Sequence, residues 1–314
     1  MISISVIIPV YNRVEELRKS LNSVVNQKYE RTEIIVVDDG STSDIREALA
    51  EPYISQKGVK LIRQQNAGPG IARNTGLKLA QGEVVIFLDS DDELRDNALI
   101  RVATEFESSN ADLVAYDFVV RDVNGTTNSS SRLLDGDYPA GEKLSGKESI
   151  DILYSGRLGN FSCMYAYRLS YLRKQGVLFP AGRVLEDAIF INELLAKKPE
   201  VSCLSGPAVY TYCMNEESLT HKRSNEAARE AINKIRAIEE MHLGEGSGYL
   251  VNLLLFAASL IDYRDSTSEA IYRQSKHELM RILRMRGVKY LSIRNAIKSL
   301  AVIVGIYRIA KSRF

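Results

Sequence analysis

The chain has 314 residues, 45% hydrophobic content and a formal net charge of +1 at pH 7, enough for one large core or for a domain with an appendage. Its three cysteines form no C-x-x-C pair, which argues against a disulfide framework and indicates reduced thiols in the cytoplasm. The sequence begins directly with a strand-like apolar run, so we expect no cleavable secretory signal. The most apolar window, residues 250–261, is too short to span a bilayer.

The first part of the chain alternates strand-like and helix-like segments. Apolar runs at Ile4–Val10, 33–37, 59–63 and 83–88 predict strands, and each is followed by a helix-like stretch. This alternation predicts crossover units in a mostly parallel sheet with helices on its faces. We therefore expect an α/β fold of the nucleotide-binding type.

The later segments predict a change of architecture. Residues 111–120 indicate a further strand, and the polar segment 121–146 indicates a long loop, because it is rich in Ser, Asn and Gly. Chemistry-bearing residues resume in a helix expected over residues 185–197. Beyond residue 223 the spacing predicts helices alone, at Asn225–Met241, 248–263, Ser268–Arg286 and 288–314. We expect two units, residues 1–222 and an all-helical module over residues 223–314.

An acidic cluster, Asp89-Ser90-Asp91-Asp92, directly follows the fourth apolar run. Parallel α/β sheets bind ligands just beyond the carboxyl ends of their strands, so the cluster lies where chemistry is expected. Carboxylates on one short turn raise one another's pKa unless a positive group lies between them, and a hard cation such as Mg²⁺ or Mn²⁺ is the natural partner. Such an ion would neutralise a diphosphate. The alternative is a loop whose aspartates cap the next helix.

Polar side chains also end the first two strands. The first ends Pro9-Val10-Tyr11-Asn12 and the second Asp38-Asp39-Gly40-Ser41, and parallel strands bring both ends to the sheet edge of Asp89. There a base would stack on Tyr11 and hydrogen-bond to Asp39, while neighbouring polar groups reach the ribose. Taken singly, Tyr11 is more often a rim aromatic and Asp38 a helix cap.

A glycine-containing segment, residues 64–74, follows the third strand with the sequence Q-Q-N-A-G-P-G-I-A-R-N. Its glycines permit close backbone approach, the following helix offers free N–H groups and Arg73 offers a planar fork, which together make a diphosphate cradle. No G-x-G-x-x-G follows the first strand, which weakens a nicotinamide-binding interpretation, and the absence of G-K-[ST] excludes a P-loop.

These motifs together resemble the family 2 glycosyltransferases of GT-A fold. S-V-I-I-P-V-Y-N, V-V-D-D-G-S-T, N-x-G-x-x-x-A-R-N and D-S-D-D occur in the family's order and spacing, and the resemblance runs from residue 3 to about residue 221. It implies a Rossmann-like GT-A domain over residues 1–222. Residues 1–110 would bind the nucleotide sugar and residues 111–222 the acceptor.

The resemblance also implies roles for individual residues. Asp91 would hold a divalent ion, Mn²⁺ or Mg²⁺, on the donor diphosphate, and Asp89 would have a ribose or metal role. Tyr11 and Asp39 are similar to the family's uracil contacts, and Arg73 to its diphosphate contact. The remaining residues expected to bind the donor are Pro9, Asn12, Asn66, Gly68 and Ser90.

A second acidic pair, Glu186-Asp187 in L-E-D-A-I-F, matches the family's motif at the start of a later helix. Asp187 would then be the general base that deprotonates the acceptor hydroxyl, supported by Glu186. One base without a carboxylate nucleophile predicts a single displacement with inversion. The alternative is ordinary acidity at a helix N-terminus, which the helix dipole favours.

Three further sites are expected with less support from spacing. His221 is a candidate third metal ligand or phosphate contact, although a lone surface histidine is the alternative. Asn160 and Tyr165 are candidate acceptor contacts, because they lie in the segment that follows the long polar loop.

The C-terminal residues form a basic amphipathic tail. From residue 271 onward there are eleven Lys or Arg and a single acidic residue, Glu278. Such a helix either lies on an anionic membrane surface, where a lipid-linked acceptor is reached, or packs its apolar stripe on the acidic body. Nucleic acid is not expected as a partner, because no aromatic platform interleaves the charges. An oligomer is compatible with the sequence.

The combined interpretation is a metal-dependent, inverting glycosyltransferase that moves a sugar, most simply from a UDP-sugar, to a hydroxyl of a growing surface glycan. One rival is a catalytically silent scaffold that binds nucleotide sugar within a glycan assembly complex. Another is a sugar-1-phosphate nucleotidyltransferase, which would need a Gly-rich basic loop where Pro9-Val10-Tyr11-Asn12 stands.

Overall fold

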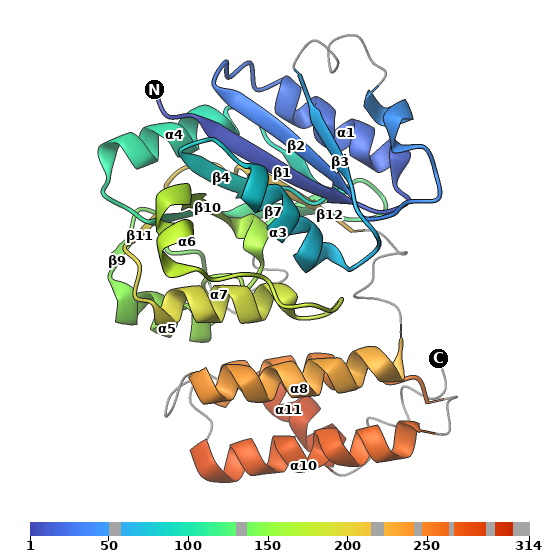
Figure 1. The fold of residues 1–314 in the computed structure, drawn as a ribbon. Helices are drawn as coiled ribbons and strands as arrows, with labels where there is room; N and C mark the ends of the chain where they lie inside the picture. The colour runs from blue at the N-terminus through green and yellow to red at the C-terminus, as the bar shows by residue number, and fades with distance from the viewer. Residues whose placement is uncertain are drawn as a thin grey trace.

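The structure is a computed structural model that describes residues 1–49, 58–129, 137–214, 223–241, 247–263, 267–286 and 293–303. An α/β part and a separate layer of helices make up these residues (Figure 1). The α/β fold class expected from the alternating segments is confirmed.

Four parallel strands form the first half of the main sheet. The central strand β1 (Ile4–Val10) lies between β2 (Thr32–Asp38) and β4 (Val84–Phe87), and β3 (Lys60–Arg63) pairs with β2. All seven residues of β1 are buried, as a parallel strand covered on both faces should be. The four predicted strands are therefore confirmed, and none of their ends differs from the prediction by more than one residue.

Helices cover this half of the sheet on both faces (Figure 1). Chain connections run through α1 (Val14–Val25), the short 3-10 turn η1 (Ile45–Leu49), α3 (Pro69–Leu79) and α4 (Ala98–Ser108). The chain steps from β1 to β2 in one direction and from β3 to β4 in the other, so right-handed crossovers place α1 and α3 on opposite faces.

The second half of the main sheet is mixed. β10 (Tyr165–Arg168) is antiparallel to both β4 and β6 (Leu113–Ala115), β11 (Val201–Cys203) is parallel to β6, and β9 (Lys143–Leu144) forms the edge. A second, four-stranded sheet has the order β5-β12-β7-β8, with bounds Glu93–Leu94, Tyr210–Cys213, Phe118–Arg121 and Thr127–Ser129.

Two expectations for this region are wrong. The single strand expected over residues 111–120 is broken into β6 and β7, which belong to different sheets, because the chain turns at Tyr116 and Asp117. The segment 121–146 is not one long loop, since β8 and β9 lie within it. The β7–β8 hairpin closes through Asp122, whose Oδ1 accepts the N–H groups of Asn124 and Thr126 at 3.0 and 2.9 Å.

Helices also cover the second half of the sheet. They are α5 (Gly146–Tyr154), the 3-10 turn η3 (Ser162–Met164), α6 (Leu169–Gln175) and α7 (Glu186–Ala196). The helix α7 is the one expected over residues 185–197. Its Phe190 is fully buried and stacks on Phe179 with ring centroids 3.9 Å apart.

Beyond residue 223 the described residues outside loops are helical. The helices are α8 (Asn225–Met241), α9 (Ser247–Ser259), α10 (Ser268–Arg286) and α11 (Ile293–Ile303). These match the predicted helices, although residues 288–292 and 304–314 of the last expected helix lie outside the described residues. The helix α11 packs on α9 and α10, and Val302 is buried there while Leu300 is 60% exposed. In the described part of the chain, no helix combines the length and the hydropathy needed to cross a membrane.

Candidate active site

The carboxyl ends of β1, β2 and β4 meet the N-terminus of α7 at one edge of the main sheet. Parallel pairing of β1 with β2 and β4 brings Tyr11, Asp39 and Asp89 to this edge. Glu186 and Asp187, more than 90 residues further along the chain, begin α7 beside it. The motifs are thus brought together at the position where α/β sheets bind ligands.

Arg73 of α3 is the centre of this cluster. Its side chain is buried, yet its guanidinium contacts Asp89 Oδ1 at 2.7 Å, Glu186 Oε1 at 3.1 Å and Asp187 Oδ1 at 3.0 Å. Burial alone would lower the pKa of Arg73, but the three carboxylates outweigh it and hold the pKa well above its ordinary value. The guanidinium also lies 5.3 Å from the ring centroid of Phe179. One cation therefore compensates three acidic groups.

Asp187 has the electrostatics of a general base. Burial is the largest cause of its shifted pKa and raises it. Arg73 lowers the pKa, Glu186 and Asp89 raise it further, and the result is a pKa of about 7. The Ser162 hydroxyl donates to Asp187 Oδ1 at 2.8 Å and fixes the orientation of the carboxyl group. A carboxylate with this pKa is matched to proton transfer near neutral pH.

The backbone places this acidic pair by means of an unusual residue. Leu185 precedes α7 with φ +56, a left-handed conformation that costs a non-glycine residue about 1–3 kcal/mol. This turn puts Glu186 and Asp187 in the first turn of α7, where the helix dipole favours negative charge.

The acidic turn after β4 divides into exposed and buried carboxylates. Asp89 is bound to Arg73, and Asp91 forms an ion pair with Arg13; their side chains are 28% and 22% exposed. Burial, partly offset by Arg13, raises the pKa of Asp91. Asp92 is fully buried, and its carboxylate accepts the Tyr210 hydroxyl at 2.6 Å and the Cys213 N–H at 2.7 Å. Asp92 therefore ties the turn to β12.

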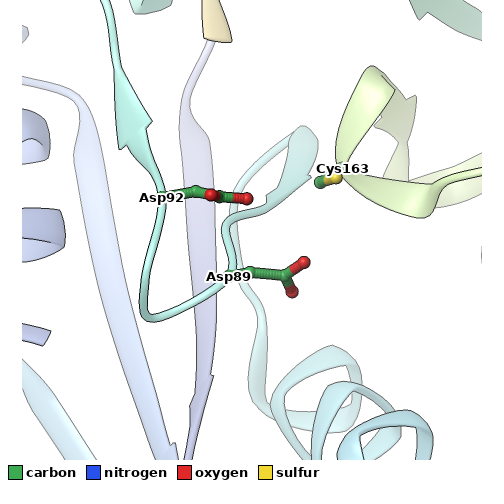
Figure 2. A group of neighbouring side chains, drawn as sticks. All are labelled: Asp89, Asp92 and Cys163. Carbon is green, nitrogen blue, oxygen red and sulfur yellow. The ribbon is translucent and has the colours of Figure 1, made fainter. Parts of the chain in front are cut away.

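Two sets of groups at this edge are candidates for a divalent-metal site. Ligand atoms of Asp89, Asp92 and Cys163 lie within 4.8 Å of one another (Figure 2). Asp92 is already bound by two donors, and burial raises the pKa of the Cys163 thiol well above its ordinary value, so that set is a poor match for Mg²⁺ or Mn²⁺. Asp89 and Asp91 offer partly exposed carboxylate oxygens on one turn, the ligand type that a hard cation prefers, and each is paired with an arginine in this structure.

The nucleotide end of the edge contains an exposed ring beside a rigid loop. Tyr11 is 45% exposed and available for stacking. Asn12, with φ +54, accepts the Thr42 N–H at 2.7 Å and so joins the ends of β1 and β2. Asp39 is buried, and its two oxygens accept the N–H groups of Ala67 and Gly68, each at 2.9 Å. Asp39 thus holds the glycine loop in place, a role that the motif comparison did not anticipate.

The glycine loop packs closely against residues 179–183. Gly68 has φ +92, and a Cβ atom there would lie 2.7 Å from the Gly182 carbonyl oxygen. Arg183 donates to Asn66 Oδ1 at 2.9 Å. Asn74 binds the backbone of Phe179 in both directions, donating to its carbonyl at 2.9 Å and accepting from its N–H at 3.0 Å. The donor loop and the segment leading into α7 are therefore one packed unit.

The expected acceptor contacts have a different outcome. The prediction that Tyr165 contacts the acceptor is wrong. Its side chain is fully buried because it lies on β10 in the middle of the sheet, and its hydroxyl donates to the Gly159 carbonyl at 2.7 Å. Asn160 is partly buried and donates to the Tyr249 hydroxyl at 3.4 Å.

Among the residues expected at the metal or the donor, His221 lies outside the described residues. Ser90 is buried in the acidic turn, and Pro9 in β1.

Two residues of this site carry no motif signal, and a third carries a weak one. Ser162 contacts Asp187, and Phe179 lies beside Arg73, only in the folded chain, and neither residue belongs to a recognisable pattern. Arg13 stands directly after Tyr11-Asn12 and forms an ion pair with Asp91. The signal for Arg13 is its position: it is a cation just after a strand end, and parallel pairing brings that strand end close to the acidic turn.

The sheet order, the carboxylates at its edge and the added helices define a GT-A type of fold. The structure aligns with Staphylococcus aureus TarS 1–349 in complex with UDP-GlcNAc at a TM-score of 0.67 and 21% identity, covering 98% of this chain and 90% of that one. A mannosyltransferase from Pyrobaculum calidifontis in complex with GDP-Man and Mn²⁺ aligns at 0.51 and 15% identity, over 100% of this chain and 87% of that one.

Residues 5–176 match the family described as glycosyl transferase family 2, and the chain belongs to that family. An uncharacterized Escherichia coli K12 glycosyltransferase, YibD, is 29% identical over 253 residues, which are 76% of this chain and 71% of YibD. TarS of S. aureus Mu50, a poly(ribitol-phosphate) beta-N-acetylglucosaminyltransferase, is 29% identical over 215 residues, 67% of this chain and 35% of TarS. The match to an uncharacterized Rickettsia bellii glycosyltransferase spans only 14% of that protein.

Proposed function

We propose that the chain is a metal-dependent, inverting glycosyltransferase that moves a sugar from a UDP-sugar to a hydroxyl group of a glycan. The observation that carries this proposal is the placement of Asp187: its carboxyl group lies at the edge where the parallel strands end, and Ser162 and Arg73 hold it beside Asp89. Burial, which raises the pKa of this carboxyl group to about 7, supports a role in proton transfer.

The chain's own residues divide the reaction between two sides of the sugar. On the acceptor side, Asp187 takes the proton of the attacking hydroxyl as that oxygen bonds to the anomeric carbon. On the donor side, the bond from the anomeric carbon to the diphosphate oxygen breaks. Attack by the acceptor opposite the leaving group inverts the anomeric centre. Arg73 keeps Asp187 oriented through its contact at 3.0 Å.

Asp89 and Asp91 would hold the metal, Mn²⁺ or Mg²⁺. When bound, a divalent cation neutralises charge that develops on the departing diphosphate. Arg13 already pairs with Asp91 and places a second positive group at this turn. The glycine loop at Asn66 to Gly68, fixed by Asp39, offers backbone close to the same edge.

The choice of a UDP-sugar rests on likeness and on Tyr11. TarS, 29% identical over 215 residues, is described as a beta-N-acetylglucosaminyltransferase, and its 1–349 fragment forms a complex with UDP-GlcNAc. The exposed Tyr11 ring supports stacking with a flat base. A glycan of the cell envelope is the corresponding acceptor class.

Donor binding and catalysis are tested separately with two variants. Nucleotide sugars bind only the folded chain, so a UDP-sugar with Mn²⁺ should raise the melting temperature, and EDTA or Asp91→Asn should remove that rise. Asp187→Asn should keep the rise but lose about 10²- to 10⁴-fold in transfer rate. Glu193→Gln, two turns along α7, is the matched control and should keep both.

Two results would count against the proposal. Full transfer activity in Asp187→Asn would remove the assigned base. A donor-induced rise in melting temperature with no transfer to any glycan acceptor would favour the silent scaffold instead.

A further inference from the structure

The segment that delivers the general base is held from the helical part of the chain as well as from the sheet. On the sheet side, Asn74 binds the backbone of Phe179, as described above. On the other side, α8 approaches residues 182–184 through Glu230 and Lys234, which stand one turn apart on the helix. Packing of α7 on α8 brings the two parts together.

Glu230 and Lys234 satisfy three backbone groups of this segment. Glu230 Oε1 accepts the Arg183 N–H at 3.0 Å and the Val184 N–H at 3.4 Å. Lys234 Nζ donates to the Val184 carbonyl at 2.7 Å and to Glu230 Oε1 at 2.7 Å. Val184 is buried, and its backbone groups would be costly to leave unpaired, so this pair of side chains determines where residue 184 lies, while the Arg183 contact is exposed.

Glycine at position 182 makes so close an approach feasible. Gly182 has φ +115, and a Cβ atom there would overlap Glu230 Oε1 and lie 2.9 Å from Lys234 Nζ. The carbonyl of Gly182 in turn faces Gly68 of the donor loop. The segment is therefore packed between α8 and the loop expected to hold the diphosphate.

A second contact fixes α7 further along its length. Asn192, fully buried on α7, donates to the Tyr249 hydroxyl of α9 at 2.8 Å. The Tyr249 ring lies 4.9 Å from the Tyr154 ring of α5. The helical part thus contacts the chain just before α7 and again at Asn192 within it, so α7 has little freedom to shift by itself.

We propose that Glu230 and Lys234 of α8 are positioning residues for catalysis, acting through residues 182–187 on both Asp187 and the donor loop. This inference rests on the proposed function for its kinetic consequence. Losing the Glu230 contacts frees the chain just before Leu185, whose left-handed conformation needs the surroundings to hold it. A displacement of about 1 Å at a reacting group lowers a rate by about 100-fold.

The test compares Glu230→Ala with Glu230→Gln and with Glu240→Ala, an exposed glutamate on the same helix. Glutamine keeps an oxygen that accepts both backbone N–H groups, so it should retain most of the wild-type kcat. Alanine should lower kcat about 10- to 100-fold with a smaller change in the KM for the donor, and should shift the acidic limb of the pH–rate profile. Glu240→Ala should match the wild type.

Hydrogen–deuterium exchange gives a readout that does not depend on turnover. Amides of residues 183–187 should exchange faster in Glu230→Ala, while amides of the main sheet stay unchanged and so exclude general unfolding. Unchanged exchange at these amides, or kinetics of Glu230→Ala equal to those of Glu240→Ala, would overturn the inference. A wild type that transfers sugar from no donor would instead overturn the proposed function, and exchange alone would then decide whether α8 holds the segment.

Discussion

Replacing Asp187 with asparagine should make the protein more stable at alkaline pH while it removes activity. In the folded chain the pKa of Asp187 is about 7, against an ordinary 3.8, so the unfolded chain loses this proton first as the pH rises. The free energy of unfolding of the wild type then falls by about 1.4 kcal/mol per pH unit between about 4 and 7 and is constant above 7. The total, about 4 kcal/mol, is absent from Asp187→Asn.

The measurement is urea unfolding of both proteins at pH 4, 5.5 and 8. Unfolding is followed by far-UV circular dichroism, because the chain has no tryptophan whose fluorescence could report on it. The difference between variant and wild type should be near zero at pH 4 and about 2 kcal/mol at pH 5.5, and reach its largest value at pH 8. Glu193→Gln should show no such trend. An Asp187→Asn advantage that is equal at pH 4 and pH 8 would refute the reasoning, since the gain would then not come from ionisation.

Three further predictions concern the donor loop and the pH dependence. Gly68→Ala should lower the free energy of unfolding by about 3 kcal/mol or more and abolish donor binding, because Gly68 has φ +92 and an added Cβ atom would lie 2.7 Å from the Gly182 carbonyl oxygen. Gly58→Ala, at φ +64 with open space around it, should lower it by only about 1–2 kcal/mol in a melting experiment on both variants. Asp39→Ala leaves the amides of Ala67 and Gly68 unpaired and should lower the free energy of unfolding by about 3–5 kcal/mol. Asp96→Ala, at an exposed position, should leave it unchanged in the same measurement, and equal losses in both variants would contradict the role of Asp39 in holding the glycine loop. The kcat/KM of the wild type should fall about tenfold per pH unit below about 7, as Asp187 gains a proton in the free enzyme, and a flat profile from pH 5 to 8 would contradict its role as the base.

The strands of the first half could be predicted because each is a short apolar run between turn-forming residues. β1 is buried along its whole length, so its sequence and its burial carry the same pattern. The break between β6 and β7 could not be predicted in this way. Both strands are apolar, and what separates them is the identity of their partners, β10 and β11 on one side and β12 on the other.

Site residues that follow strand ends were predictable for the same reason, since topology alone brings those ends to one edge. Local sequence says little about what each side chain then touches. Asp39 is expected at a base, and the local sequence gives no indication that its oxygens also accept backbone amides 28 and 29 residues further along the chain. Tyr165 was expected at the acceptor, but the antiparallel pairing of β10 buries it completely. Ser162 became visible only through its contact with Asp187.

The three carboxylates around Arg73 bear on where the chain can be cut. The residues that match the family end at 176, ten positions before Glu186. A fragment with that boundary would keep the contact of Arg73 with Asp89 but lose both acidic partners on α7, together with the Phe179 ring beside the guanidinium and the Phe179 backbone that pairs with Asn74. It would also expose the apolar core residue Phe87, on which Phe179 and Phe190 pack, so such a fragment should aggregate or stay unfolded on expression. The segment that matches the family model is therefore shorter than the segment that can be expected to fold by itself.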